Sequence, residues 1–154
     1  MNRVLIICLG NICRSPMGQG ALEARMRCEG MPHECVVDSA GVSGWHEGSP
    51  PDPQAIACAQ RHGVDIAHQR ARRVVAADFE RFDWLLCADR QNLDALVQCA
   101  PAGLAHKAAL WLAWAGGDPP YDIPDPYRGS DQLFDAVWQR IDRAAQGTVR
   151  RLLT

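Results

Sequence analysis

The sequence predicts an α/β fold: a three-layer sandwich in which helices flank a central, mostly parallel, four-stranded sheet. Short apolar runs alternate along the chain with longer stretches of helical periodicity. The first apolar run, residues 4–9, is unbroken and has a β-branched centre, which is typical of a strand buried on both faces of a parallel sheet. With 154 residues the chain has room for about one domain, so we expect residues 1–154 to form a single unit.

The elements of the first half have clear start and stop signals. The predicted strands are residues 4–9 and 34–40, the predicted helices are residues 15–30 and 52–63, and a loop rich in glycine and proline spans residues 41–51. Both helices begin with a residue that favours the N-cap followed by proline, and both end at a glycine. Gly18 and Gly20 each cost the first helix up to about 1 kcal/mol relative to alanine, so this helix depends on packing.

The second half of the chain continues the alternation. We expect a third strand at residues 82–88, a short helix at 90–99 and a fourth strand at 110–112, while the rest of residues 100–117 has no clear pattern. Four prolines make residues 116–129 an irregular loop. Ser130 caps the last helix, in which apolar residues recur at helical spacing up to Leu152. Trp111, Trp114 and Trp138 are expected to pack in the core.

The composition excludes several classes of protein. Hydrophobic residues make up 47% of the chain and charged residues 22%, which excludes a disordered chain, a collagen-like repeat and a coiled coil. A formal charge of −2 argues against a nucleic-acid partner held by phosphate neutralisation. Since no apolar stretch approaches the roughly 20 residues of a membrane span and no secretory signal is present, we expect a cytoplasmic protein that binds no membrane. In that compartment its seven cysteines stay reduced.

The junction between the first strand and the first helix is a predicted anion site. Its sequence is Cys8-Leu9-Gly10-Asn11-Ile12-Cys13-Arg14-Ser15. A strand–loop–helix junction directs backbone N–H groups and the positive end of the helix at one point, where a thiol is favoured as the thiolate. Gly10 and Asn11 tolerate a left-handed backbone, and Arg14 offers a planar fork for two phosphate oxygens. The alternative for Cys8 is a small buried hydrophobe at a strand end.

This loop resembles the signature loop of the low-molecular-weight protein tyrosine phosphatases. Further motifs of that family follow in order: Ser39-Ala40-Gly41, Trp45-His46-Glu47-Gly48, Asp52-Pro53, Gly63-Val64-Asp65, His68-Gln69-Arg70-Ala71-Arg72, Asp89-Arg90-Gln91-Asn92 and Asp122-Ile123-Pro124-Asp125-Pro126-Tyr127. Residues 100–117 match the family weakly. Vertebrate members have a second tyrosine where this chain has Arg128, so the resemblance is to the bacterial type, and a phosphorylation switch at that position is unavailable.

The resemblance implies a phosphotyrosine phosphatase and a role for each reacting residue. Cys8 would attack phosphorus in line to give a cysteinyl phosphate, while Arg14 and the loop amides would hold the equatorial oxygens. Asp125 would protonate the leaving phenolate and then deprotonate the attacking water. The phosphate-binding loop would consist of Leu9, Gly10, Asn11, Ile12, Cys13, Arg14 and Ser15. We expect no metal and no cofactor, since no cluster in the sequence has metal-ligand spacing.

Several of these assignments have an ordinary structural alternative. The residues alone do not separate Asp125 from Asp122, and only the resemblance favours Asp125. In the family, Asn11, Ser15, Ser39 and His68 would support the loop, and Trp45 and Tyr127 would sandwich the phosphotyrosine ring. Taken alone, Ser15 is a helix N-cap, His68 a surface histidine and Trp45 a scattered exposed aromatic.

The other cysteines receive fewer roles. Cys13 would capture an oxidised Cys8 as a disulfide, and the alternative is a packed structural thiol. We assign nothing beyond packing to the remaining cysteines, Cys28, Cys35, Cys58, Cys87 and Cys99.

Two other functions stay open from the sequence. A thioredoxin-coupled arsenate reductase shares this fold and a similar anion loop, but it needs two further cysteines close together. The nearest candidates, Cys87 and Cys99, are twelve residues apart with a predicted helix between them. A catalytically silent phosphotyrosine-binding module would lack Cys8 or Asp125, and both are present.

The implied partner is a phosphotyrosine-containing protein. Bacterial members of the family commonly oppose tyrosine kinases that control exopolysaccharide production, while some are exported to act on host proteins, and the sequence does not choose between these. We expect a monomer or a weak dimer, because exposed aromatic residues at the cleft allow weak self-association.

Overall fold

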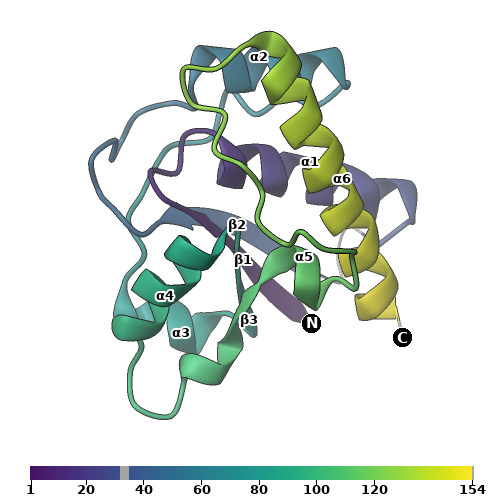
Figure 1. Cartoon of the computed structure of the whole chain (residues 1–154). Coiled ribbons are helices and arrows are strands. Elements are labelled where there is room, and N and C mark those ends of the chain that lie inside the picture. Colours follow the sequence, from purple (N-terminus) through teal and green to yellow (C-terminus); the bar gives the residue numbers. More distant parts are fainter. Residues whose placement is uncertain (32–34, 154) are drawn as a thin grey trace.

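A four-stranded sheet forms the centre of the protein, and Figure 1 shows it in a computed structural model of the chain. The structure describes residues 1–31 and 35–153. The strands are β1 (Asn2–Cys8), β2 (Cys35–Gly41), β3 (Trp84–Cys87) and β4 (Ala108–Leu110). All of them run parallel, in the order β2-β1-β3-β4. The predicted four-stranded sheet is confirmed, and it is parallel throughout.

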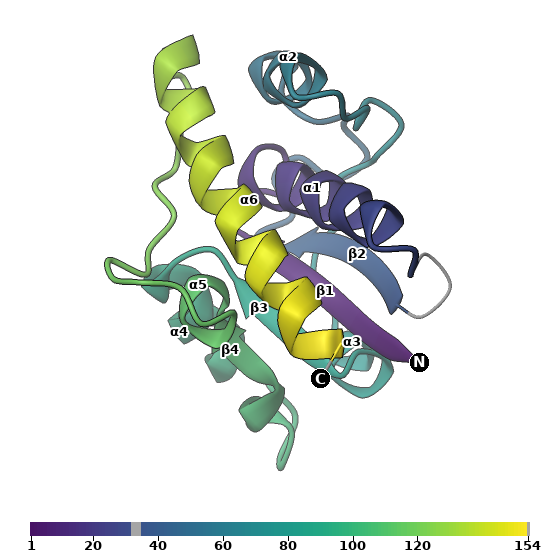
Figure 2. The same cartoon turned by 90° about the vertical axis from the view of Figure 1, so that its right-hand side faces the viewer.

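Helices cover both faces of this sheet, so the predicted three-layer α/β fold is confirmed. They are α1 (Arg14–Cys28), α2 (Pro53–Arg61), α3 (Ala76–Arg81), α4 (Arg90–Gln98), α5 (Trp111–Trp114) and α6 (Asp131–Leu153), with a short 3-10 turn, η1, at Ala105–Lys107. One core contains residues of α1, α2, α5 and α6, and the opposite core contains residues of α3 and α4. Figure 2 shows the long α6 crossing the first of these faces beside α1.

Strand β1 lies inside the sheet and is buried on both sides. Val4 and Ile6 belong to the core under α1 and α6, whereas Leu5 and Ile7 belong to the core under α3 and α4. This alternation explains why the first apolar run of the sequence is unbroken. The chain continues from β1 to β2 on one side and later reaches β3 on the other. In open α/β sheets, ligands bind at the carboxyl ends of the strands where the strand order reverses, which here is the end of β1.

The ends of most predicted elements agree with the structure. Asp52 caps α2 by accepting a 2.9 Å hydrogen bond from the Gln54 N–H, and Ser130 accepts a 3.1 Å bond from the Leu133 N–H at the start of α6. The second strand begins at Cys35 among the described residues, and Glu34 lies outside them. The third strand is shorter than predicted, and Cys99 lies just beyond the end of α4.

The fourth strand was predicted at the wrong place. It ends at Leu110, and the chain turns immediately into α5, so residues 111 and 112 are helical. The reason is the burial of Trp111, whose indole N–H donates a 2.8 Å hydrogen bond to the Thr148 hydroxyl on α6. Trp114 and Trp138 are buried as well, as expected.

Helix α3 was absent from the sequence prediction. With six residues it is too short to show a helical period. It is held instead by the buried Asp78, whose carboxylate accepts the Val75 N–H at 2.8 Å and pairs with Arg72 at 3.0 Å.

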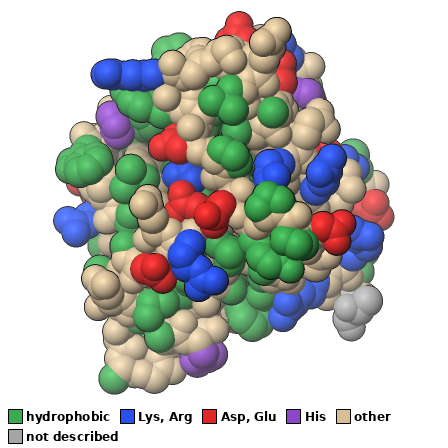
Figure 3. Space-filling view, in the orientation of Figure 1, with side chains coloured by type: hydrophobic (Ala, Val, Ile, Leu, Met, Phe, Trp, Pro, Cys, Tyr) green, Lys and Arg blue, Asp and Glu red, His purple; other side chains and the backbone are tan. Residues whose placement is uncertain are grey.

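The surface shows no strongly charged field on the face in Figure 3, where acidic and basic side chains are interspersed. Within residues 1–31 and 35–153, no helix is both long enough and apolar enough to cross a membrane.

The two glycines inside α1 permit close packing. A Cβ atom on Gly18 would lie 2.8 Å from the Trp111 ring, and one on Gly20 would lie 2.6 Å from Ile66 and 2.9 Å from Val64. Real Cβ atoms do not approach their neighbours this closely. The absence of a side chain at Gly18 and Gly20 therefore allows α1 to pack this closely, which explains why the helix depends on packing.

Replacing Gly20 by alanine is expected to destabilise the protein. The gain in helix propensity is about 1 kcal/mol, but overpacking against the stiff side chains of Ile66 and Val64 costs about 1–3 kcal/mol. Thermal unfolding should show a lower Tm, whereas alanine at the exposed Arg27 of the same helix should leave it nearly unchanged. A higher Tm for Gly20→Ala would contradict this account of the packing.

Candidate active site

Cys8 is the last residue of β1, and the loop that follows it leads directly into α1. Its Sγ atom lies 3.0 Å from the Ser15 hydroxyl, and both residues are buried. Helix α1 begins at Arg14, because the Met17 N–H already donates to the Cys13 carbonyl at 3.1 Å. The expectation that Ser15 caps this helix is therefore wrong. Ser15 lies within the first turn, where its hydroxyl faces Cys8.

Neighbouring segments hold the loop by its carbonyl groups. The carbonyls of Cys8, Leu9 and Ile12 accept hydrogen bonds of 2.9–3.0 Å from the N–H groups of Val42, Ser43 and Asp52. Across a trans peptide, a carbonyl and the N–H that follows it point in opposite directions. The N–H groups after these carbonyls therefore point away from the surrounding chain and toward the inside of the loop.

The side chain of Asn11 fixes the turn of the loop. Its backbone is left-handed, with φ at 58°, and its side chain is buried. The amide nitrogen donates to the hydroxyls of Ser15 at 2.7 Å and Ser39 at 2.9 Å, and the amide oxygen accepts the Arg72 N–H at 3.0 Å. This network connects the loop to β2 and to the segment before α3.

The structure does not bring His68 into this network. Its side chain is exposed, and among the described residues it makes no hydrogen bond to the loop. The backbone of Arg72 occupies the amide oxygen of Asn11 instead. The neighbouring Gln69, to which the sequence analysis gave no role, is buried and donates a 3.1 Å hydrogen bond to the Pro16 carbonyl behind the loop.

The guanidinium group of Arg14 is buried and held by two partners. Its Nη1 atom donates to Asp89 Oδ2 at 2.6 Å and to the Ile123 carbonyl at 2.8 Å. Burial alone lowers the pKa of Arg14, but the charge of Cys8 and the hydrogen bond to Asp89 outweigh it and leave that pKa above its ordinary value. The group is therefore a fixed positive charge.

Asp89 and Ile123 are the main site residues that the sequence analysis missed. Asp89 follows β3 and uses its other oxygen to cap α4, accepting the Asn92 N–H at 2.8 Å. The Ile123 N–H donates to the Ala88 carbonyl at 2.9 Å, which fixes the loop before Asp125. One signal pointed to Asp89: it is an acidic residue that follows the strand beside β1, and the carboxyl ends of parallel strands meet at one edge.

The structure separates the two candidate acids of the irregular loop. Asp125 Oδ2 lies 3.8 Å from Arg14 Nη2, and its side chain is about 45% exposed, so it faces both the buried cation and solvent. Its other oxygen accepts the Tyr127 N–H at 3.1 Å. Asp122 accepts the Arg90 N–H at 3.0 Å, at the start of α4.

One pocket brings the predicted reacting groups and the predicted aromatic residues together. Cys8, Arg14 and Asp125 line it, as do Trp45 and Tyr127. Trp45 is 78% exposed and Tyr127 42%, so both rings have free surface. His46 also lines the pocket, and its ring centroid lies 6.4 Å from that of Tyr127.

Two further features border this pocket. The guanidinium carbon of Arg128 lies 5.2 Å from the centre of the Tyr127 ring, which is a cation–π contact. Cys13 lines the pocket from within the loop. Burial, followed by the charge of Asp52, raises the pKa of the Cys13 thiol well above its ordinary value, so this sulfur keeps its proton near neutral pH.

Comparisons with known proteins give a consistent result. Residues 3–153 match the family model described as low molecular weight phosphotyrosine protein phosphatase. A low molecular weight protein-tyrosine-phosphatase of Streptomyces coelicolor is 38% identical over 150 residues, which are 94% of this chain and 90% of that protein. A low molecular weight phosphotyrosine protein phosphatase of Sus scrofa is 36% identical over 97% of this chain and 94% of its own. The structure of Vibrio vulnificus Wzb in complex with benzylphosphonate superimposes on this structure with a TM-score of 0.85 and 33% sequence identity. The superposition covers 97% of this chain and 98% of the Wzb chain.

Proposed function

The chain belongs to the low molecular weight phosphotyrosine protein phosphatase family and is a protein-tyrosine phosphatase, and we propose that Cys8, Arg14 and Asp125 carry out its reaction. The observation that carries this proposal is the convergence of a thiol, a buried guanidinium and a carboxyl group in one pocket. Relatives of this chain include bacterial enzymes.

Cys8 is the nucleophile. Its sulfur attacks phosphorus in line, so that an S–P bond forms while the P–O bond to the phenol breaks. The Ser15 hydroxyl, 3.0 Å from the sulfur, donates a hydrogen bond that stabilises the thiolate before attack and after its release. The inward N–H groups of the loop and the fork of Arg14 hold the three equatorial oxygens as their charge shifts in the transition state. Asp89 keeps the fork in place by occupying one of its edges.

Asp125 transfers the protons. As a carboxylic acid it protonates the leaving phenolate, and as a carboxylate it then accepts a proton from the water that hydrolyses the cysteinyl phosphate. Its partial exposure and its 3.8 Å distance from Arg14 support this assignment, because a phosphate ester held by Arg14 lies within reach of the carboxyl group.

The aromatic walls of the pocket favour a phosphorylated phenol over a phosphorylated alcohol. Trp45 and Tyr127 offer ring faces on which a phosphotyrosine ring stacks. Benzylphosphonate, which Vibrio vulnificus Wzb holds, likewise joins an aromatic ring to a phosphonate. The substrate class is therefore phosphotyrosine in proteins, and a bacterial tyrosine kinase is our proposed physiological partner.

Replacing Asp125 by asparagine is expected to lower kcat by about 10²–10⁴-fold with phenyl phosphate. The loss in kcat/KM, which reports the first chemical step, should be smaller with p-nitrophenyl phosphate, because p-nitrophenolate leaves without needing a proton. Steady-state kinetics on both substrates measure this difference. Asp122→Asn removes the same charge three residues earlier and should change kcat by no more than a few fold. Equal losses for the two variants, or the same loss in kcat/KM with both substrates, would contradict the role of Asp125 as the acid.

The geometry weighs against a thioredoxin-coupled arsenate reductase. Cys87 is fully buried at the end of β3, and Cys99 is exposed beyond the far end of α4. The nine residues of α4 span about 13 Å, whereas the Cα atoms of a disulfide lie within about 7 Å. The two sulfurs are therefore badly placed to relay a disulfide.

Cys13 is proposed as the partner that protects an oxidised Cys8. Peroxide converts the Cys8 thiolate to a sulfenic acid, and the Cys13 sulfur then attacks it, forming a disulfide and releasing water. Since the attacking species is the thiolate and the pKa of Cys13 is raised, its reactive fraction grows with pH. The rate of Cys8–Cys13 disulfide formation should increase from about pH 6 to pH 8. Mass mapping after mild peroxide treatment measures this rate. Absence of a Cys8–Cys13 disulfide, or a rate independent of pH, would remove this proposal.

Two organisational proposals remain. Residues 1–154 form one domain, which the packing of both cores against a single sheet supports. We also propose that the protein works in the cytoplasm, because a reducing compartment suits an enzyme whose nucleophile is a thiol.

A further inference from the structure

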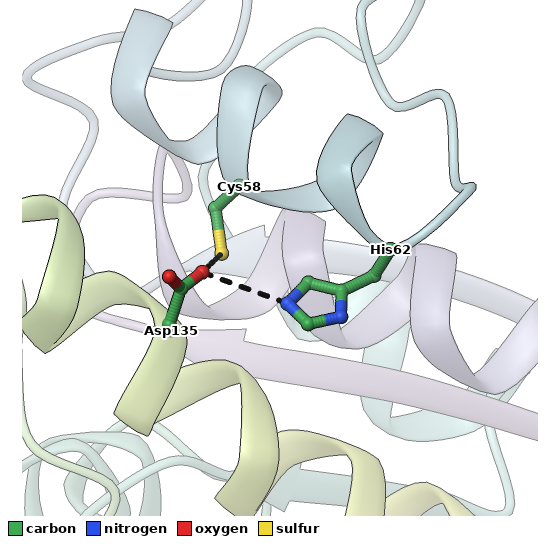
Figure 4. A group of neighbouring side chains, drawn as sticks. All are labelled: Cys58, His62 and Asp135. Carbon is green, nitrogen blue, oxygen red and sulfur yellow. Dashed lines mark hydrogen bonds and ion pairs between the residues drawn. The ribbon is translucent and has the colours of Figure 1, made fainter.

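A second cluster of reactive side chains lies between α2 and α6 (Figure 4). Cys58 and His62 are one helical turn apart, on α2 and at its C-terminal cap, and Asp135 lies in the second turn of α6. Asp135 Oδ1 is 3.6 Å from Cys58 Sγ and 3.5 Å from His62 Nε2. All three ligand atoms lie within 4.8 Å of one another.

We propose that Cys58, His62 and Asp135 bind a zinc ion, with water as the fourth ligand. Thiolate, imidazole and carboxylate together form a donor set that zinc prefers over magnesium or calcium. Tetrahedral zinc, with bonds of about 2.0–2.3 Å, separates its ligand atoms by about 3.3–3.8 Å. Two of the three separations already fall in this range, and the third requires only a small approach of Cys58 and His62.

Two of the three ligands are held in place before any ion binds. Cys58 is fully buried, so its sulfur is fixed by the packing of α2 on α6. The His62 ring stacks on Trp138, with centroids 5.0 Å apart and planes 7° from parallel, and its Nε2 atom faces Asp135. Little side-chain freedom is therefore lost on binding.

Binding zinc displaces one proton and one competing cation. Burial, then the hydrogen bond to Asp135, raises the pKa of Cys58 to about 11, so zinc replaces the S–H hydrogen and the proton goes to solvent. Arg61 Nη2 lies 2.8 Å from the same Asp135 oxygen. This ion pair is partly exposed, and such pairs are weak, so the Arg61 side chain can move into solvent. Asp131 is the other charged group near Cys58 and is of favourable sign for a cation.

The ion would fasten α2, which adjoins the phosphate loop, to α6. Asp52, at the start of α2, donates its N–H to the Ile12 carbonyl of that loop, and Cys58 and His62 lie farther along the same segment. A ligand that binds the folded state and links α2 to α6 raises the unfolding temperature with its concentration. Zinc is therefore expected to raise the Tm.

Calorimetric titration with zinc tests the proposal, using metal-free protein reduced with a phosphine. The starting protein is Cys8→Ser, so that the active-site thiol does not bind the ion. We expect one zinc per chain, with affinity reduced at least about tenfold by Cys58→Ser and by Asp135→Asn. Arg61→Gln should tighten binding, because it removes the competing cation. Cobalt should give a thiolate charge-transfer absorption that Cys58→Ser abolishes.

Matched controls separate the site from general effects. Asp142→Asn removes another ion pair of α6, to Arg25 at 2.6 Å, and Cys99→Ser removes an exposed thiol; both should bind zinc as before. Three results would overturn the proposal. Zinc does not bind; Arg61→Gln does not tighten binding; or Asp142→Asn weakens binding as much as Asp135→Asn does. If the buried Cys58→Ser variant does not fold, His62→Gln and Arg61→Gln, which change partly exposed side chains, test the proposal in its place: His62→Gln should weaken zinc binding and Arg61→Gln should tighten it.

Discussion

Replacing Cys8 by serine is expected to abolish hydrolysis of p-nitrophenyl phosphate, with a loss in kcat of more than about 10⁴-fold. A hydroxyl is a far weaker nucleophile than a thiol near neutral pH, and the rest of the pocket only holds the phosphate. The folded variant should still bind inorganic phosphate, since Arg14 and the loop are unchanged. Steady-state kinetics and phosphate titration measure these two effects separately.

Cys28→Ser is the matched control for this variant. Cys28 is an exposed cysteine at the end of α1, so the same substitution there should leave kcat within a few fold of the parent. Substantial turnover by a folded Cys8→Ser protein, at a rate near that of Cys28→Ser, would show that another group attacks the phosphate.

Replacing Arg14 by lysine is expected to lower kcat/KM by about 10³-fold or more, although the positive charge is kept. The planar fork of arginine bonds Asp89 and the Ile123 carbonyl while presenting its other edge to the substrate. A lysine ammonium is a single point and does not span both sides. The variant should show a lower kcat and weaker inhibition by inorganic phosphate.

Arg25→Lys provides the control for this substitution on the same helix. Arg25 pairs with Asp142 at 2.6 Å in a partly exposed position, so its kinetic effect should be small. An Arg14→Lys enzyme with near-normal kcat/KM would contradict the bidentate role of the guanidinium.

The parts of the site that are local in sequence were predictable. The unbroken apolar run, the glycine and asparagine after it and the helix behind them identify an anion loop from one short segment. The structure gives that segment its expected left-handed residue at Asn11. The exact start of α1 was not predictable. The helix begins at Arg14, before the Ser15-Pro16 signal, and Ser15 contacts Cys8 instead of capping the helix.

The parts that depend on distant contacts were not predictable from local pattern. Asp89 and Ile123 reach Arg14 across 75 and 109 residues, and only the parallel order of the strands brings them together. Cys58 and Asp135 are 77 residues apart, so no ligand spacing in the sequence indicated their cluster. The placement of His68 was unpredictable for the opposite reason: its motif is local, but the chain there turns Gln69 inward and leaves the histidine exposed.

The most direct test of the central claim is to trap the covalent intermediate. The wild-type enzyme is mixed with excess p-nitrophenyl phosphate, denatured within the first turnovers and analysed by peptide mapping. We predict phosphate on the sulfur of Cys8, in an amount that increases in Asp125→Asn, where its hydrolysis is slowed. Phosphate on a different residue, or steady turnover with no phosphate on any cysteine, would contradict the proposed mechanism.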